Sequence, residues 1–89
     1  MTTTMNQEIE APIRNFIATN LLYSKDGFTY PDDASLLREG IIDSLGVVEL
    51  VEFLQSKFSV KVEQNEVRPD NFDSVAKMAA FVRRKTGAA

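Results

Sequence analysis

Apolar residues recur at helical spacing in three separate stretches of the chain. In the first stretch they lie three or four residues apart, at Ile9, Ile13, Phe16, Ile17 and Leu21. This spacing predicts an amphipathic helix. A proline fits the first turn of a helix but kinks its interior, so Pro12 places the start of the regular helix near residues 8–11. We expect this helix to end around Leu22.

The other two stretches predict helices in the middle and at the end of the chain. The middle helix should run from Ser44 to about Phe58, with its apolar stripe at Val47, Leu50, Val51, Leu54 and Phe58. The last helix should follow Asp73 as its N-cap and end in a basic turn before Gly87. Its inward stripe comprises Val75, Met78, Ala79 and Val82, with Phe81 beside it and Phe72 just ahead of it.

The segments between these helices should pack against them. Residues 23–43 are a long connection, and loops of about 20 residues without structure of their own are uncommon in compact domains. We expect a single helical turn at residues 35–38 and four apolar anchors: Leu36, Leu37, Ile41 and Ile42.

After the middle helix, residues 59–62 should form an extended loop with Val60 and Val62 inward. Residues 64–68 should form a short helical turn that Pro69 stops. The predicted fold is all-α, a small four-helix bundle of three main helices and one short helix with a long first loop.

Composition excludes several kinds of chemistry. The 89 residues predict one domain over residues 1–89, with residues 1–7 and 86–89 as flexible ends. The chain has no Cys and no His, so disulfides, thiolate or histidine metal sites and histidine-based catalysis are excluded. No apolar run approaches the roughly 20 residues that span a bilayer, and the polar start lacks the pattern of a signal peptide. We expect a monomeric, cytoplasmic protein that is not an enzyme.

Charge is distributed unevenly around a net value of −3. Residues 39–73 hold eight acidic and three basic side chains, whereas residues 74–89 hold four basic side chains and no acid. The acidic centre argues against nucleic acid as a partner and favours basic protein surfaces. The basic end complements the dipole of the last helix.

The segment 40–54 reads G-I-I-D-S-L-G-V-V-E-L-V-E-F-L and carries the strongest candidate site. Asp43 and Ser44 are both good N-cap residues for the middle helix. A serine at a helix start is exposed and lies in the positive field of the helix N-terminus, which suits a phosphate ester.

The block D-S-L-G-V-V-E-L-V-E-F-L-Q-S-K-F and the downstream E-V-R-P-D-N-F-D-S-V resemble acyl and peptidyl carrier proteins. The likeness covers nearly the whole chain. It implies an acyl-carrier-protein-like fold with a covalent 4′-phosphopantetheine on Ser44, flanked by Asp43 and Leu45. In this chain Gly40 lies four residues before the serine, where many family members have a glycine two or three residues before it. The loop that enters Ser44 should therefore have its own shape, which bears on the transferase that recognises it.

The resemblance also implies how such a carrier works. Leu45, Val48, Glu49 and Glu52 would dock partner enzymes: a phosphopantetheinyl transferase, an acyl- or aminoacyl-AMP ligase or an acyltransferase, and downstream synthases or transferases. Biosynthesis of fatty acids, polyketides or nonribosomal peptides, and cell-wall D-alanylation, all remain open. Phe53 falls between the docking face and the core, and we assign it to the core.

Other interpretations of the same residues remain. Ser44 could be an unmodified N-cap, and Glu49 and Glu52 could form a plain solvated face. The protein would then be a helical adaptor that docks through its acidic middle helix. A carboxylate enzyme built on these two glutamates would need a convergent pocket, which nothing in the sequence indicates.

Overall fold

The computed structural model describes the backbone of residues 4–87 and the side chains of residues 9–87. It contains the helices α1 (Thr4–Phe16), α2 (Ser44–Phe58), α3 (Pro69–Phe72) and α4 (Val75–Thr86). A π-helical turn, η1 (Ile17–Leu21), extends α1, and a 3-10 turn, η2 (Gln64–Glu66), precedes α3. The described residues form no strand, which confirms the predicted all-α bundle of three main helices and one short one.

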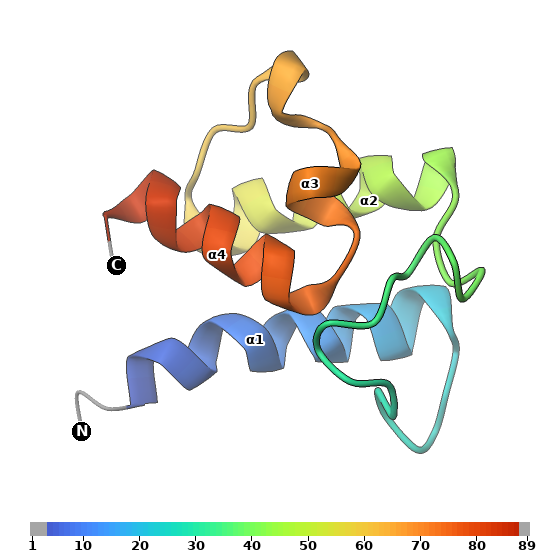
Figure 1. Ribbon diagram of the computed structural model, residues 1–89. Coiled ribbons are helices and arrows are strands. Elements are labelled where there is room, and N and C mark those ends of the chain that lie inside the picture. The colour runs from blue at the N-terminus through green and yellow to red at the C-terminus, as the bar shows by residue number, and fades with distance from the viewer. Residues whose placement is uncertain (1–3, 88–89) are drawn as a thin grey trace.

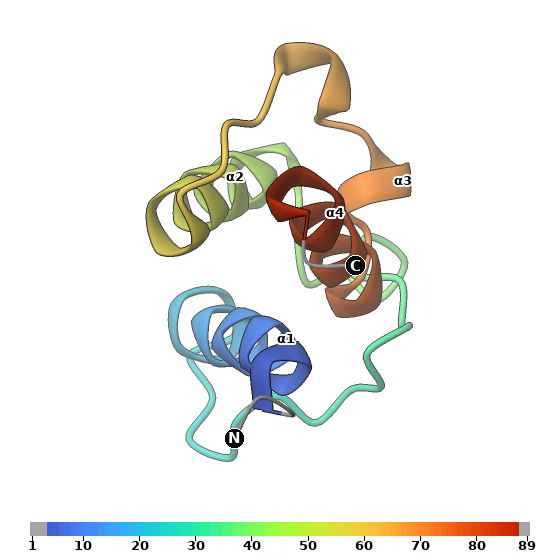
Figure 2. The same ribbon diagram turned by 90° about the vertical axis from the view of Figure 1, so that its left-hand side faces the viewer.

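The three main helices lie side by side, and α2 and α4 both run in the direction opposite to α1 (Figures 1 and 2). The short α3 precedes α4. This arrangement brings the start of α2 to the end of the molecule where η1 finishes α1. The long connection, residues 22–43, runs over the same end (Figure 1).

The predicted start of α1 is wrong, because the helix begins at Thr4 and contains Pro12 in its interior. A proline ring removes one backbone N–H and so one intrahelical hydrogen bond. Ile9 and Ile13, on either side of Pro12, are both buried. Their packing holds the helix together across the proline. Residues 4–7 of the predicted flexible start are thus helical, and residues 1–3 and 88–89 lie outside the described residues.

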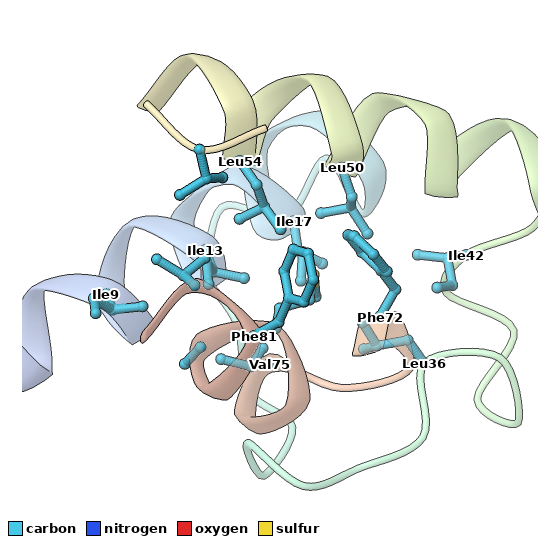
Figure 3. Close-up of a cluster of buried hydrophobic side chains, with 14 residues drawn as sticks. Ile9, Ile13, Ile17, Leu36, Ile42, Leu50, Leu54, Phe72, Val75 and Phe81 are labelled. Carbon is cyan, nitrogen blue, oxygen red and sulfur yellow. The ribbon is translucent and has the colours of Figure 1, made fainter. Parts of the chain in front are cut away.

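Fourteen buried apolar side chains from every main helix form one core (Figure 3). The predicted apolar stripes of α2 and α4 both face this core. Phe72 and Phe81 pack at its centre with their ring centroids 5.4 Å apart. Phe53 stacks on Phe16 at 4.4 Å and packs against the core, as predicted. In the loop after α2, Val60 is buried and Val62 packs against the core, which is also confirmed.

The long connection is fastened to α1 and to the start of α4. Asp32 forms a two-pronged ion pair with Arg14 of α1, with Arg14 Nε 2.7 Å from Asp32 Oδ1. The carbonyl of Asp32 also accepts the backbone N–H of Ala76 at 2.9 Å. The Asp73 carboxylate accepts the Ser35 hydroxyl at 2.7 Å. The predicted packed connection is confirmed.

Two predicted element ends are wrong, because the residues involved have other partners. Ser74, not Asp73, caps α4, and its hydroxyl accepts the N–H of Lys77 at 3.0 Å. Asp73 is committed to the long connection instead. Pro69 does not stop the preceding turn, which has already ended at Glu66, but opens α3 at a position where its missing N–H costs nothing.

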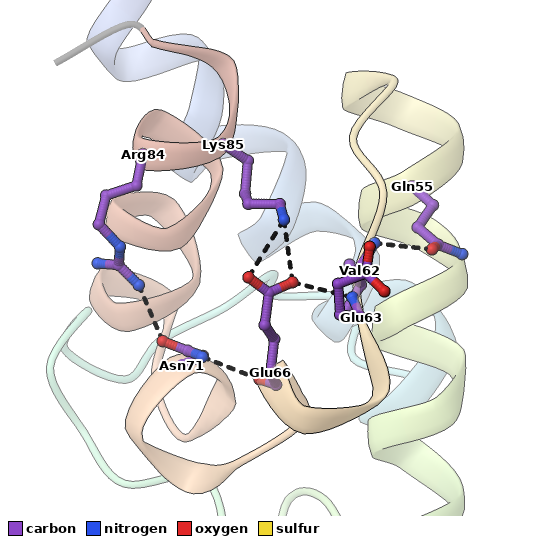
Figure 4. A network of polar contacts seen from close by, with 7 residues as sticks. All are labelled: Gln55, Val62, Glu63, Glu66, Asn71, Arg84 and Lys85. Atoms are coloured by element: carbon purple, nitrogen blue, oxygen red, sulfur yellow. Dashed lines mark hydrogen bonds and ion pairs between the residues drawn. The ribbon is translucent and has the colours of Figure 1, made fainter.

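A polar network holds the segment between α2 and α4 (Figure 4). The Glu66 carboxylate accepts Lys85 Nζ of α4 at 3.0 Å and the backbone N–H of Glu63 at 2.9 Å. The side-chain amide of Asn71 donates to the Glu66 carbonyl and accepts from Arg84, both at 2.9 Å. These contacts hold η2 and α3 against α4. They therefore also fix the side of α3 that faces α2.

Candidate functional site

Ser44 is the first residue of α2, and its side chain is exposed. The preceding Asp43 is extended, and its Oδ1 accepts the N–H of Gly46 at 2.9 Å. Asp43 is therefore the N-cap, and the alternative in which Ser44 caps the helix is wrong. The Ser44 hydroxyl has no hydrogen-bond partner among the described residues.

A tight turn before α2 sets the position of Asp43 and Ser44. The carbonyl of Leu36 accepts the N–H groups of Ile41 and Ile42, at 2.8 and 3.4 Å. Gly40 makes this reversal possible with a φ of +74°, in the left-handed region that favours glycine. Leu36 and Ile42 are buried in the core, so the turn is anchored at both of its ends.

The field around Ser44 favours an anion on its oxygen. The N–H groups of the first turn of a helix lack intrahelical partners, and the helix dipole adds partial positive charge there. The first turn of α2 contains no acidic side chain. Glu49 and Glu52 lie farther along α2 and are exposed. A phosphate ester on Ser44 would thus lie at the positive end of the helix, with the acidic face beyond it.

An apolar groove of about 250 Å³ opens on one side of Ser44. Ser44 itself lines this groove, which lies between the start of α2 and the segment containing α3. Most of its lining is apolar and comprises Leu37, Ile42, Val47, Val48, Val67 and Phe72. We call it the α2–α3 groove.

A second hollow of about 200 Å³ lies near the end of η1. Its lining includes Tyr23, Asp43, Leu45 and Glu49, and so combines an aromatic ring, an aliphatic side chain and two carboxylates. We call it the Tyr23 pocket. Ile42 lines both hollows, so they flank the loop that delivers Ser44.

Comparison with known protein sequences places the chain among related proteins. No family model matches the chain. A protein of a Serratia strain named "Probable acyl carrier protein PigG" is 35% identical over 77 residues, which are 85% of this chain and 86% of that relative. The chain belongs to the acyl carrier protein family. The D-alanyl carrier protein of Streptococcus pyogenes serotype M5 is 41% identical over 50 residues, or 56% of this chain and 63% of that protein.

The exposed apolar surface of this carrier protein is concentrated around Ser44. The large exposed apolar side chains of the described residues are Tyr23, Leu37, Leu45, Val48 and Val67. Each of them lines one of the two hollows. Since exposed apolar side chains that cluster mark interaction surfaces, the two hollows and Ser44 form one candidate functional end.

The predicted docking residues are all exposed and lie at i, i+3, i+4 and i+7 spacing in α2, which places them along one face of the helix. Val48 lines the α2–α3 groove, whereas Leu45 and Glu49 line the Tyr23 pocket. Glu52 lines neither hollow. The predicted docking face of α2 therefore borders both hollows, with Val48 at the α2–α3 groove and Leu45 at the Tyr23 pocket.

Sequence reasoning missed three residues of this functional end. Leu37 was expected in the core, but its side chain is 44% exposed, because in the turn only its neighbour Leu36 points inward. Tyr23 and Val67 were not singled out at all. Val67 could have been suspected as an apolar residue next to a charged one in a polar segment. Nothing in the sequence marks Tyr23, because its exposure depends on the backbone at the end of η1.

The described residues contain no group of acidic side chains that could hold a metal ion. None of the described helices is long and apolar enough to cross a membrane.

Proposed function

We propose that this carrier protein holds an acyl or aminoacyl cargo on a 4′-phosphopantetheine arm attached to Ser44. One observation carries the proposal: the Ser44 hydroxyl is exposed at the start of α2 and has no partner among the described residues, because Asp43 does the capping. A serine that served only as a cap would use its oxygen on the helix. Here the oxygen is left for a transferase.

Attachment uses the groups already described. The Ser44 oxygen loses its proton and forms a bond to the phosphorus of coenzyme A that bears the pantetheine, while adenosine 3′,5′-bisphosphate leaves. The product is a phosphodiester, whose negative charge the unpaired N–H groups at the start of α2 stabilise. Asp43 keeps those groups in place by fixing the first turn.

The α2–α3 groove is suited to cover what is attached. The bound arm supplies a terminal thiol that holds cargo as a thioester. Leu37, Val48 and Val67 line the groove next to Ser44 and would shield apolar parts of the arm or of a small acyl group from water. At the centre of the core, Phe72 and Phe81 are both buried with their ring centroids 5.4 Å apart, whereas the α2–α3 groove is lined in part by Ser44 itself.

Partner enzymes would load and unload the arm without binding tightly. We infer that they are a phosphopantetheinyl transferase, an acyl- or aminoacyl-AMP ligase or an acyltransferase, and downstream synthases or transferases, all in the cytoplasm. Leu45, Val48, Glu49 and Glu52 offer small apolar contacts and negative charge to basic surfaces. Small, partly electrostatic interfaces associate fast and release fast, which a shuttle requires. The carrier itself is not an enzyme.

Intact mass tests the attachment. The chain is incubated with coenzyme A and a phosphopantetheinyl transferase of broad specificity, and we expect one added arm per chain. Ser44→Ala should abolish the addition. Ser56→Ala, which removes another exposed hydroxyl of α2, should leave it unchanged. A folded wild-type protein that keeps its original mass would contradict the proposal and favour the unmodified adaptor.

A further inference from the structure

Tyr23 is the most exposed large apolar residue among those described, with 82% of its surface accessible. Its position is fixed by the backbone. The N–H of Leu22 donates to the carbonyl of Ile17, five residues earlier, and the N–H of Ser24 to that of Ala18, both at 2.9 Å. Tyr23 itself has a left-handed φ of +52°. A tyrosine held outward in this way is presented to solvent by a defined structure.

The charges of the Tyr23 pocket are all of one sign. Its lining includes Asp43 and Glu49 but no lysine or arginine. One oxygen of Asp43 accepts the N–H of Gly46, whereas the Glu49 carboxylate has no hydrogen bond or ion pair among the described residues. The pocket thus places uncompensated negative charge beside an exposed aromatic ring and the 68%-exposed Leu45.

Arginine is the side chain that can interact with the aromatic ring, the apolar surface and the carboxylates of this pocket at the same time. Its planar guanidinium stacks on an aromatic ring and donates hydrogen bonds to a carboxylate, and its aliphatic stem covers apolar surface. Lysine offers a point charge with a stronger hydration shell and stacks less well. A purely apolar side chain would leave Asp43 and Glu49 without a counter-charge.

We propose that the Tyr23 pocket receives an arginine side chain from the enzymes that act on this carrier, with Tyr23 as the stacking surface and Glu49 as the ion-pair partner. The inference rests on the proposed function, because the partners are those that modify, load or unload Ser44. Since Asp43 and Ile42 belong to the pocket, an arginine seated there would fix the partner relative to the loop that carries Ser44. The contact is thus a positioning contact on the α1 side of Ser44, separate from the α2–α3 groove.

The first test is the steady-state kinetics of Ser44 modification by the broad-specificity transferase. Tyr23→Asn keeps a residue that tolerates the left-handed backbone but removes the ring, and should raise KM for the carrier about threefold to tenfold with kcat unchanged. Tyr23→Phe should behave as wild type. Ser59→Asn is the matched control, because Ser59 also has a positive φ, of +56°, at the far end of α2.

The glutamate is tested in the same assay. Glu49→Gln should raise KM by a similar factor, whereas Glu39→Gln removes an equal charge from an exposed residue outside both hollows and should not. If both groups contact one guanidinium, the double variant should raise KM by less than the product of the single effects. Independent effects, or a Tyr23→Asn variant that matches Ser59→Asn, would overturn the proposal.

A second test does not depend on modification. Arginine amide at millimolar concentration is titrated into the full chain and followed by ¹H–¹⁵N NMR. We expect shifts centred on Tyr23, Gly46 and Glu49 that are lost in Tyr23→Asn and in Glu49→Gln and are weaker with lysine amide. Identical shifts in all three proteins would overturn the arginine pocket. A wild-type chain that binds arginine amide here but is never modified would instead refute the proposed function alone.

Discussion

Three residues at the entry to α2 determine how the Ser44 hydroxyl is presented. Gly40 reverses the chain, Asp43 caps α2, and Ser44 is left without an internal partner among the described residues. If Ser44 were the cap instead, its oxygen would accept a backbone N–H and would have to break that bond to react. The shift of the cap by one residue therefore makes the serine available at no cost to the helix.

Gly40→Ala should affect both stability and modification. A side chain at φ +74° strains the backbone, so we expect a loss of about 1 kcal/mol in the free energy of unfolding, measured with urea. We also expect slower modification of Ser44, because relief of that strain shifts the turn that delivers it. Gly27→Ala is the control, since Gly27 has a similar φ of +81° and also has open space around it. Equal modification rates in the two variants would show that the Gly40 turn does not position Ser44.

At the scale of elements, the sequence correctly predicted the helices that are marked by nearby residues, such as a capping side chain or an apolar stripe. The bounds of α2 were predicted as observed, because an acceptor side chain precedes it and an apolar stripe at helical spacing runs along it. The four-helix class and the inward residues of α4 followed from the same kind of pattern. Ser44 was predicted from its motif as an exposed residue at the start of this helix, and it is exposed there. Attachment of an arm to it stays a prediction.

The elements that were missed depend on contacts between distant parts of the chain. Pro12 lies within α1 because residues on both sides of it are buried in the core. The cap of α4 falls on Ser74 because Ser35 and Leu37, more than 35 residues earlier, occupy the Asp73 carboxylate. The spacing of residues along the sequence does not reveal such contacts between distant residues. The Tyr23 pocket was missed for the same reason, since η1, the turn and α2 build it together.

Substitutions at Asp73 and Ser74 should distinguish the capping of α4 from the fastening of the long connection. Ser74→Ala removes the buried cap of α4 and should lower the free energy of unfolding by about 1–2 kcal/mol. Asp73→Ala should instead loosen the connection that Ser35 and Leu37 fasten. Hydrogen exchange should then speed up at the Ile41 and Ile42 amides in Asp73→Ala, beyond what its loss of stability explains. The same protection of these two amides in both variants would contradict the assignment.

At the scale of the molecule, the fold separates a closed core from one open end. The core side chains of α1, α2 and α4 are buried together (Figure 3). The long connection and the α3 segment help to line two hollows of different character near Ser44. One hollow is apolar and adjoins the hydroxyl, and the other is acidic and aromatic. Under the proposed function, the apolar hollow would cover cargo while the acidic hollow would hold a partner enzyme.

Two ion pairs that join distant segments make this architecture sensitive to acid. The hydrogen bonds from Arg14 lower the pKa of Asp32 below its ordinary 3.8. The N–H of Glu63, and then Lys85, lower the pKa of Glu66 below 4.5. A carboxylate whose pKa is lower in the folded than in the unfolded state stabilises the fold above the unfolded value. That stability is lost as the pH falls through the lowered folded value.

Asp32→Asn tests this coupling at the level of the whole fold. At neutral pH the variant should be less stable by about 1 kcal/mol, because the two-pronged pair is partly exposed and partly screened by solvent. On acidification from pH 5 to below about pH 3 the difference from wild type should shrink, since protonation of Asp32 removes the same interaction. Asp33→Asn, the matched change at the exposed neighbouring carboxylate, should follow the wild-type curve. Urea unfolding over a series of pH values measures all three proteins, and a constant gap between Asp32→Asn and wild type across the series would show that the Arg14–Asp32 pair does not set the acid limit.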